Sequence, residues 1–371
     1  MSTLPVDLAA WLDAAALRLD TSNDDAAEVL PRLAAADLFR IGVPAAHGGR
    51  GGDVIDAVAA IAAVSERSLA AGFVFWGHRT FIEYLLQSPN AALGDKLLPD
   101  LLAGRRAGAT GLSNAMKFLS GIEELQIRAT PEADGRLRID GKLPWVTNLP
   151  RGGFEVAAAI AGDGHAPAFV AVLSSDDEGL ARSDDLDLMA MRATSTAALQ
   201  FDNVRLGEDR ILHRNASEWL PKGRPAFPPL QCAMSSGLAR RSLAEAGGRL
   251  DRDRDVLARP VTELAAALRA AEAALRDGLS GHRFVAHPAQ LFRLRIRLAE
   301  IAAEALQLEL SAAGGRAYLS GPGAGFQRRQ REAAFLPIIT PSIVQLKLSL
   351  QIHEQPQEQR HQQPAAISAI A

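Results

Sequence analysis

Leu143-Pro-Trp-Val-Thr-Asn148 lies in the middle third of a chain of 371 residues, where the spacing of apolar residues changes from helical to β-like. Short alternating or apolar runs in this region predict strands at 125–129, 137–140, 168–173 and 198–201. Asp134-Gly135 and Asp140-Gly141 predict tight turns between strands. The middle third is therefore predicted to be an antiparallel sheet or barrel with few and short strands.

Helical spacing dominates on both sides of this region. Before it, blocks at 6–19, 24–36, 54–73 and 80–102 predict four or five helices. After Pro228, helical spacing returns at 230–250, 261–279, 288–313 and 326–350. Pro337 and Pro341 interrupt the last block, because each proline removes a backbone donor and clashes with the preceding turn.

The fold class predicted from this order is mainly α with a central β domain. The expected domains are an N-terminal helical domain (1–106), a middle β domain (107–217), a C-terminal helical bundle (218–352) and a disordered tail (353–371). The tail is polar and rich in Gln, so it lacks the apolar residues needed to fold alone.

Composition limits the classes of partner. The formal net charge of -3 offers no global field for nucleic acid or an anionic membrane. The N-terminus has no basic leader, and no stretch reaches the roughly 18 uncharged apolar residues of a membrane span. The single cysteine, Cys232, excludes an internal disulfide and a thiolate metal cluster, so no metal is expected and the cytoplasm is the expected compartment.

Five strings in this order resemble segments of the acyl-CoA dehydrogenase superfamily. Residues 37–51 are similar to its "GLF.i.vPe.yGG.G" segment, 143–148 to "k.WITN", 191–206 to "mR.s.t..l.FdnVrVP", 314–318 to "GG.Gy" and 328–333 to "R..RDa". The resemblance covers roughly residues 25–350 and implies that family's three-part architecture, with FAD bound between the β domain and the helical bundle.

The resemblance also implies individual cofactor contacts. Trp145 would lie against the isoalloxazine ring, with Thr147 and Asn148 near the ring's edge, and Ser113 would contact its pyrimidine side. Gly314-Gly315 would meet the adenine end of a neighbouring subunit's FAD, which implies a homodimer or homotetramer. The full set of implied cofactor-binding residues is Thr110, Leu112, Ser113, Trp145, Thr147, Asn148, Gly314, Gly315 and Ser342.

Ordinary structural roles compete with these assignments. A Trp in a strand more often packs in a core, and Gly314-Gly315 could equally end a helix. Arg331-Glu332, which resembles the family's Arg-Asp pair, is expected to form ion pairs rather than contact substrate. His78 lies in an Ala-rich helical run, where a lone histidine is usually structural.

The chain departs from the family's pattern at its catalytic acid. The family removes an α-proton with a Glu shortly after "RDa", and the residue at that position here is Thr340, which cannot act as a base at neutral pH. The alternative location, residues 227–237, has no acid either. The catalytic residues are therefore unknown. Cofactor signals are also altered at 116–120, at Ser311 and at 254–258.

Three functions remain open from the sequence. The first is a flavin-dependent oxidoreductase of acyl-CoA dehydrogenase type, acting on the CH–CH group of an acyl thioester with an unidentified base and an unknown electron acceptor. The second is a flavin-dependent monooxygenase on the same fold, which does not require that Glu. The third is a decayed paralogue that supports partner subunits, against which the Trp-Val-Thr-Asn string argues.

Overall fold

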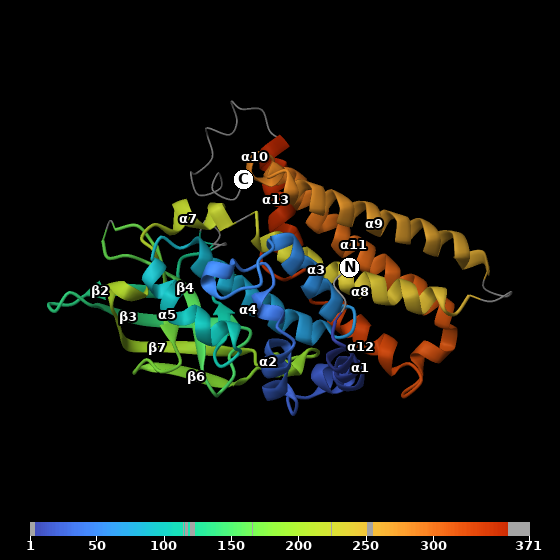
Figure 1. Ribbon diagram of the computed structural model, residues 1–371, viewed down its shortest axis with the longest axis horizontal. Helices are drawn as coiled ribbons and strands as arrows, with labels where there is room; N and C mark the ends of the chain where they lie inside the picture. The colour runs from blue at the N-terminus through green and yellow to red at the C-terminus, as the bar shows by residue number, and fades with distance from the viewer. Residues whose placement is uncertain are drawn as a thin grey trace.

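The computed structural model describes residues 4–113, 115, 118, 123–164, 166–223, 225–250 and 255–354. Helices precede and follow a region of two β-sheets, as the sequence predicts (Figure 1). The sheets occupy one end of the molecule, and the long helices α8 (Phe227–Gly247), α9 (Ala258–Ser280) and α11 (Pro288–Ala313) occupy the other. The chain therefore has the mainly α fold with a central β region expected from its sequence.

The N-terminal helices contact both the sheets and the C-terminal helices. They are α1 (Val6–Thr21), α2 (Ala26–Ala35), α3 (Val54–Ser65), α4 (Leu69–Gln87) and α5 (Ala91–Leu102), with short 3₁₀ turns η1 (Leu38–Arg40) and η2 (Ala45–His47). The predicted block 54–73 is wrong as a single helix. Ser68 breaks it, because its hydroxyl accepts a hydrogen bond from the Ala71 amide and begins α4.

The β region contains two four-stranded sheets in the orders β1-β4-β5-β8 and β2-β3-β7-β6. The strands are β1 (Ala107–Thr110), β2 (Ile127–Pro131), β3 (Leu137–Val146), β4 (Phe154–Ile160), β5 (Phe169–Ser174), β6 (Leu180–Asp185), β7 (Ala197–Leu206) and β8 (Ile211–His213). The expectation of few and short strands is wrong, since β3 and β7 each have 10 residues. Pairing is antiparallel apart from β1, which runs parallel to β4.

Two details of the β region differ from the sequence prediction. Asp140-Gly141 is not a turn but lies within β3, where a register shift against β7 forms a bulge. Gly141 has φ +139°, and a Cβ there would lie 2.1 Å from the Gln126 carbonyl oxygen, so glycine is needed for close approach rather than for reversal. Strand β4 was missed because its Ala-rich run is buried on both faces and has little β propensity.

The three long C-terminal helices match their predicted spans closely, whereas α7 (Ala216–Gly223) and α10 (Arg283–Ala286) were not predicted. The C-terminal helices also include α12 (Ala324–Ala333) and α13 (Ile343–Glu354), with 3₁₀ turns η5 (Asp255–Leu257) and η6 (Gly314–Tyr318). In the β region, η3 (Arg192–Thr194) and η4 (Glu208–Arg210) flank β7. Pro337 and Pro341 fall between α12 and α13, as predicted. The predicted disordered tail lies outside the described residues from 355 onward.

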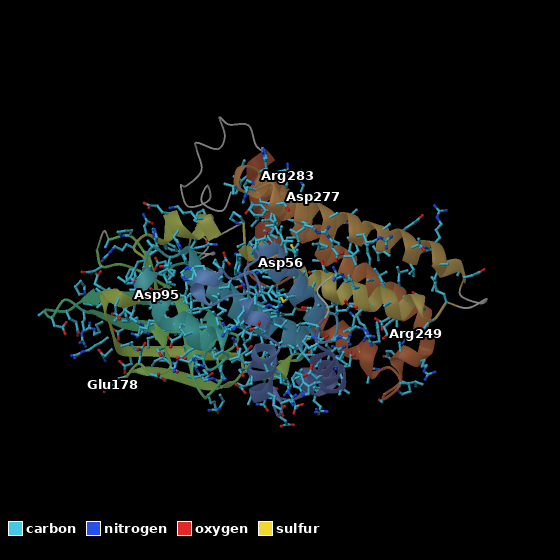
Figure 2. The ribbon with its side chains drawn as sticks, viewed as in Figure 1. Asp56, Asp95, Glu178, Arg249, Asp277 and Arg283 are labelled. Carbon is cyan, nitrogen blue, oxygen red and sulfur yellow. The ribbon has the colours of Figure 1, made fainter. Side chains whose placement is uncertain are left out.

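One hydrophobic cluster joins the N-terminal helices, both sheets and the C-terminal helices. A buried carboxylate adds a polar link: Asp20 of α1 accepts hydrogen bonds from the Met191 amide at 2.9 Å and from Arg331 Nε of α12 at 3.0 Å. Charged side chains are distributed over the whole molecule, with Glu178 beside the sheets and Arg249 beside the C-terminal helices (Figure 2). Within the described residues, no helix is long and apolar enough to cross a membrane.

Candidate functional site

A cavity of about 280 Å³ lies where the sheets meet the helices. Its wall is built from the ends of elements: α4, the end of β1, the end of β3, the start of α8 and the segment between α12 and α13. The residues that line it are Phe73, Trp76, Thr110, Leu112, Ser113, Trp145, Thr147, Phe227, Phe335, Ile338, Ile339 and Thr340. Five of the predicted cofactor-binding residues (Thr110, Leu112, Ser113, Trp145, Thr147) thus line the same cavity.

Trp145 is the large aromatic residue of this wall that faces open space. It stands near the end of β3, beside a register shift against β7, and 45% of its surface is exposed. Its ring is nearly parallel to that of Phe335, at 17° and 6.2 Å between centroids. Core packing, the ordinary role of a strand tryptophan, does not account for an indole exposed at a cavity, which suggests a ligand surface.

Three threonine hydroxyls form a chain that begins at Thr147, two residues after Trp145. Thr147 Oγ1 lies 3.0 Å from Thr196 Oγ1, which lies 2.8 Å from Thr194 Oγ1, and all three side chains are buried. On the other side of the cavity, Thr110 Oγ1 lies 3.0 Å from the Tyr84 hydroxyl. The hydroxyl groups are therefore held in fixed positions by protein partners.

Asn148 has a different location from its neighbour Thr147. It adopts the left-handed backbone conformation with φ +65°, is buried, and donates its side-chain amide to the Gly108 carbonyl oxygen at 2.8 Å. It is not among the residues that line the cavity. The amide ties the end of β3 to β1, and so it fixes the direction of the preceding Trp-Val-Thr.

The part of the cavity wall between α12 and α13 is held by two buried side chains. Arg295 Nη2 of α11 donates to the Leu336 carbonyl oxygen at 2.7 Å, and Gln231 Nε2 of α8 donates to the Thr340 carbonyl oxygen at 2.7 Å. Arg295 is fully buried, and this burial lowers the pKa of its guanidinium. These bonds fix both ends of the segment that carries Ile338 and Ile339.

Gly314, Gly315 and Ser342 are not among the residues that line this cavity. Gly314 ends α11 with φ +59°, and both glycines are exposed, with nothing within 4 Å of an added Cβ. A groove of about 840 Å³ beside them includes Arg241, Arg249 and Arg316. Ser342 begins α13, since its hydroxyl accepts from the Gln345 amide at 3.3 Å while its own amide donates to Gln345 Oε1 at 2.7 Å.

The charged residues singled out from the sequence form internal pairs. Glu332 accepts from Arg328 at 2.9 Å and from the Leu69 amide at 3.2 Å. Arg331 binds Asp20, with Nη2 2.5 Å from the carboxylate. The expectation that Arg331 and Glu332 form ion pairs agrees with this geometry. Burial of the Glu332 carboxyl group raises its pKa.

His78 of α4 is fully buried and faces α5 and β1. Its Nδ1 accepts from the Gly108 amide at 2.9 Å, so its Nε2 carries the proton and donates to the Leu101 carbonyl oxygen at 2.9 Å. Burial lowers its pKa to about 4. Both ring nitrogens are used and the ring does not line the cavity, so the geometry supports the structural role.

No described residue that lines the cavity is Asp, Glu or His. Thr340, which stands where the family's Glu is expected, is part of the wall. The described residues also contain no group of three or more His, Cys, Asp or Glu side chains that could hold a metal ion. The cavity can bind a flat apolar molecule and offer hydroxyl groups to its edge, but its described side chains cannot remove a proton from carbon at neutral pH.

Sequence reasoning missed the aromatic part of the wall: Phe73, Trp76, Phe227 and Phe335. These residues occupy ordinary apolar positions of helices, or the short segment after α12, and no local pattern distinguishes them from core residues. A second cavity of about 230 Å³, on which Trp145, Phe73 and Phe335 also border, was missed as well. It includes Thr194 and Thr196, so the threonine chain connects the two cavities.

Sequence comparison finds similarity to acyl-CoA dehydrogenases. A family model described as "Acyl-CoA dehydrogenase, N-terminal domain" matches residues 9–105. The mitochondrial isovaleryl-CoA dehydrogenase of Pongo abelii is 26% identical over 246 residues, which are 63% of this chain and 54% of that protein. The chain spans about half the length of the curated relatives that it matches.

Solved structures extend the likeness over nearly the whole fold. Butyryl-CoA dehydrogenase from Megasphaera elsdenii has a TM-score of 0.77 at 17% identity and covers 95% of this chain and 99% of its own. Dibenzothiophene monooxygenase TdsC from Paenibacillus sp. A11-2 has a TM-score of 0.73 at 21% identity and covers 94% and 96%. TdsC has also been solved with FMN and indole. At these identities the likeness establishes the fold.

Proposed function

Because this chain belongs to the acyl-CoA dehydrogenase superfamily, we propose that it is a flavin-dependent oxidoreductase that oxygenates its substrate. The observation that carries this proposal is the cavity beside Trp145, whose described lining contains no carboxylate or imidazole. Dehydrogenation of an acyl thioester needs a base at the α-carbon. Monooxygenation, the activity named for the neighbour TdsC, does not require a base at that position.

The residues around this cavity fit a flavin. Trp145 presents an open indole face, and the hydroxyls of Thr110, Ser113 and Thr147 border the same space. A flat ring system gains affinity from stacking and from a few oriented hydrogen bonds. A bound flavin would supply two-electron redox chemistry and pass electrons to dioxygen. In this proposal Trp145 stacks on the ring and Thr147 meets its edge.

The remaining wall residues would shield the reacting groups from water. Phe73 and Phe335 contact each other edge to face at 5.0 Å and separate the two cavities. The overall balance consumes dioxygen, two electrons and two protons, places one oxygen atom on the substrate and releases the other as water. The electrons come from an external two-electron donor that reduces the flavin.

We assign the flavin as FAD and the protein as a homo-oligomer. The support is Gly314-Gly315, which is exposed beside a groove that Arg316 borders. Arg241 and Arg249 also border this groove and pair with Glu245, so Arg316 is the side chain that would attract a pyrophosphate. In this proposal the groove receives the adenine end of a neighbouring subunit's FAD, and Asn148 and Ser342 act by positioning. The same proposal keeps three domains, 1–106, 107–217 and 218–352, and a reducing, cytoplasmic location. Sedimentation monitored at a flavin wavelength tests it: a colourless monomer in the presence of added FAD would contradict both assignments.

A second candidate is the dehydrogenation of an acyl thioester, which is favoured by the curated relatives that are named isovaleryl-CoA dehydrogenases. Two measurements on flavin-loaded protein separate the candidates. Oxygen consumption by the chemically reduced protein is expected, whereas anaerobic bleaching of its flavin by acyl-CoAs is not. Rapid bleaching would establish the second candidate instead. A chain that takes up neither FAD nor FMN would be a decayed paralogue.

A further inference from the structure

Aromatic side chains are concentrated around the cavity. Only 5% of the chain is Phe, Trp or Tyr, yet five of the described residues that line this cavity are Phe or Trp. They contact one another in a continuous series: Trp145–Phe335 at 6.2 Å, Phe335–Phe73 at 5.0 Å, Phe73–Trp76 at 5.3 Å and Trp76–Phe227 at 5.5 Å. The series runs from β3 across the cavity to α4 and α8.

A flavin accounts for the Trp145 end of this series. At the other end, Phe227 and Leu112 also border a smaller cavity of about 40 Å³. This smaller cavity is again aromatic, since Tyr84, Trp219 and Phe292 line it. The Tyr84 and Trp219 rings meet edge to face at 5.4 Å. The aromatic wall therefore continues away from Trp145, beyond the face on which a flavin would stack.

The described walls of both cavities contain no charged side chain. The Tyr84 hydroxyl is engaged with Thr110, and burial raises the pKa of Tyr84, so that it stays neutral. Moving an ion into such surroundings without a partner is costly, whereas aromatic rings gain from offset and edge-to-face contacts with the wall. The walls thus favour an uncharged, flat molecule over an ionic one or a saturated one of equal size.

We infer that the substrate of this site is a small uncharged aromatic compound, which lies against Trp76 and Phe227 with its reacting edge toward Trp145. The inference rests on the proposed function, because the flavin occupies the Trp145 end. Leu112 and Phe227 border both cavities, so the aromatic ring would lie against them at the end of the larger cavity away from Trp145. Specificity would then come from ring contacts rather than from an ionic anchor.

The test compares benzyl alcohol with cyclohexylmethanol, which have the same heavy atoms and differ in aromaticity, and adds benzoate as the charged probe. Binding to the flavin-loaded protein is measured by calorimetry and by perturbation of the flavin absorption bands. Benzyl alcohol is expected to bind about two- to tenfold more tightly than cyclohexylmethanol, from one or two aromatic contacts. Benzoate is expected to bind more weakly than benzyl alcohol.

Phe227→Leu keeps an apolar side chain and removes one ring, so it should abolish most of the preference for benzyl alcohol. Phe284→Leu is the matched control, because Phe284 is equally apolar but packs on Gly278, away from both cavities. It should keep the preference. Equal binding of the two alcohols, or a Phe227→Leu variant with unchanged preference, overturns the inference about the substrate. The proposed function is then still tested separately by the oxygen consumption of the reduced protein. A chain without bound flavin overturns both.

Discussion

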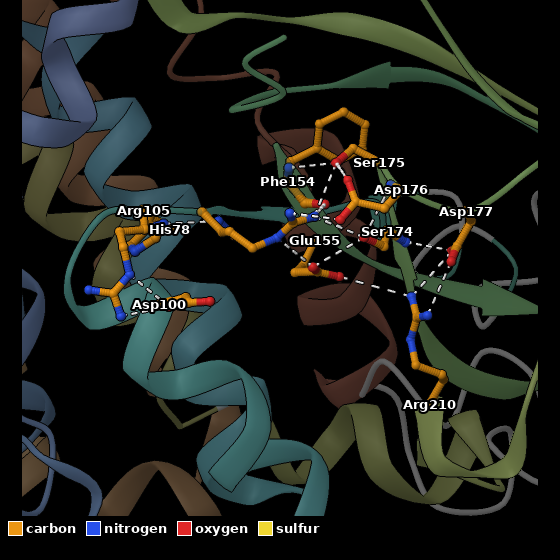
Figure 3. A network of polar contacts seen from close by, with 12 residues as sticks. His78, Asp100, Arg105, Phe154, Glu155, Ser174, Ser175, Asp176, Asp177 and Arg210 are labelled. Atoms are coloured by element: carbon orange, nitrogen blue, oxygen red, sulfur yellow. Dashed lines mark hydrogen bonds and ion pairs between the residues drawn. The ribbon is translucent and has the colours of Figure 1, made fainter. Parts of the chain in front are cut away.

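The cavity beside Trp145 and the region around β1 and β4 differ in the side chains that they contain: the described cavity lining is uncharged, whereas charged side chains pair with one another around β4. Around β4, Arg106 Nε binds Glu155 at 2.8 Å, and Figure 3 shows the Arg210 guanidinium between the carboxylates of Glu155 and Asp177. His78 shares this region and uses both ring nitrogens. Around the cavity, the described side chains are aromatic, aliphatic or hydroxylic.

This difference indicates where the chemistry of the protein originates. The titratable side chains near the functional region are paired with one another and serve the fold. The cavity keeps an open aromatic face but no described acid or base, so in the proposed function its chemistry would come from a bound flavin and from dioxygen. Substitutions that place a charge in the cavity, or that remove a titratable side chain from the paired region, test this difference directly.

Thr340→Glu should give the largest effect, because it places a carboxylate on the wall of the cavity that Trp145 also lines. The native protein is expected to be a poor dehydrogenase of acyl-CoAs, since loss of a general base typically costs about 10²–10⁴ in rate. The variant should gain a comparable factor in anaerobic bleaching of bound flavin by a panel of acyl-CoAs. Gln231 still holds the backbone at residue 340, so the loop need not move.

Thr340→Gln is the control for this variant, because it has the same size and no charge. It should bleach as slowly as the native protein. Rapid bleaching of the native protein by an ordinary acyl-CoA would contradict the prediction and require a base in another part of the chain.

His78 gives the next effect, in stability rather than activity. Its folded pKa of about 4 lies below the unfolded value of 6.5, so the unfolded chain takes up the proton first as the pH falls. The stabilisation is complete above pH 6.5 and decreases toward pH 4, by about 3 kcal/mol. Denaturant unfolding at several pH values should show this loss in the native protein and not in His78→Gln.

Other titratable groups also change the stability of the native protein with pH. Their contributions cancel when the native protein is compared with His78→Gln. Burial raises the pKa of Glu155 and Glu332, so each makes folding more favourable as the pH falls, opposite in sign to His78. His47→Gln, in the exposed 3₁₀ turn η2, is the control and should keep the native dependence. If His78→Gln loses as much stability as the native protein over this range, His78 is not the cause.

The fold was largely predictable from the sequence because its helices carry clear periodicity and clear ends. The span 288–313 coincides with α11, which proline begins and glycine ends. Strands were predicted where β-branched and aromatic residues occur, as in β5, and missed in Ala-rich β4. Asp140-Gly141 has the composition of a turn, and only its register shift against β7 shows that it is a bulge.

The site was predictable only in part. Trp145 and Thr147 could be identified because the string around them is distinctive, and both line the cavity. Phe73 and Phe227 could not, since their role depends on how α4 and α8 meet at the cavity, which is a tertiary property. A local sequence pattern could not predict the buried role of Asn148 either, because its hydrogen-bond partner Gly108 lies 40 residues away in the sequence.

Trp145→Ala tests whether the open indole serves a ligand. Stacking on one face contributes about 1–3 kcal/mol, so flavin affinity should fall about five- to hundredfold. The apoprotein should lose less stability, because nearly half of the Trp145 surface is already exposed. Trp11→Ala is the control: Trp11 stacks under Arg32, away from the cavity, and its loss should leave flavin affinity unchanged. Equal losses of affinity and apoprotein stability in Trp145→Ala would make Trp145 a core residue.

The smallest effect is expected from the threonine chain, which sets the direction of the Thr147 hydroxyl. A hydroxyl has a single proton to donate, so Thr147 can donate to a flavin edge only if it accepts from Thr196, 3.0 Å away. Thr147→Val should weaken flavin binding about two- to tenfold and shift the reduction potential, with little change in melting temperature. Thr196→Val removes the hydroxyl group that pairs with Thr147 and leaves the Thr147 hydroxyl in place to contact the flavin.

The double variant separates this role from packing. If Thr196 acts through Thr147, Thr196→Val should shift the potential in the native background and have almost no further effect in the Thr147→Val background. Potentials are measured by equilibrium titration against a reference dye, and Thr262→Val, on the exposed surface of α9, is the control. Additive shifts would mean that the two hydroxyls act independently. The buried threonine chain would then be part of the fold, like the ion pairs around Glu155, rather than part of the cavity.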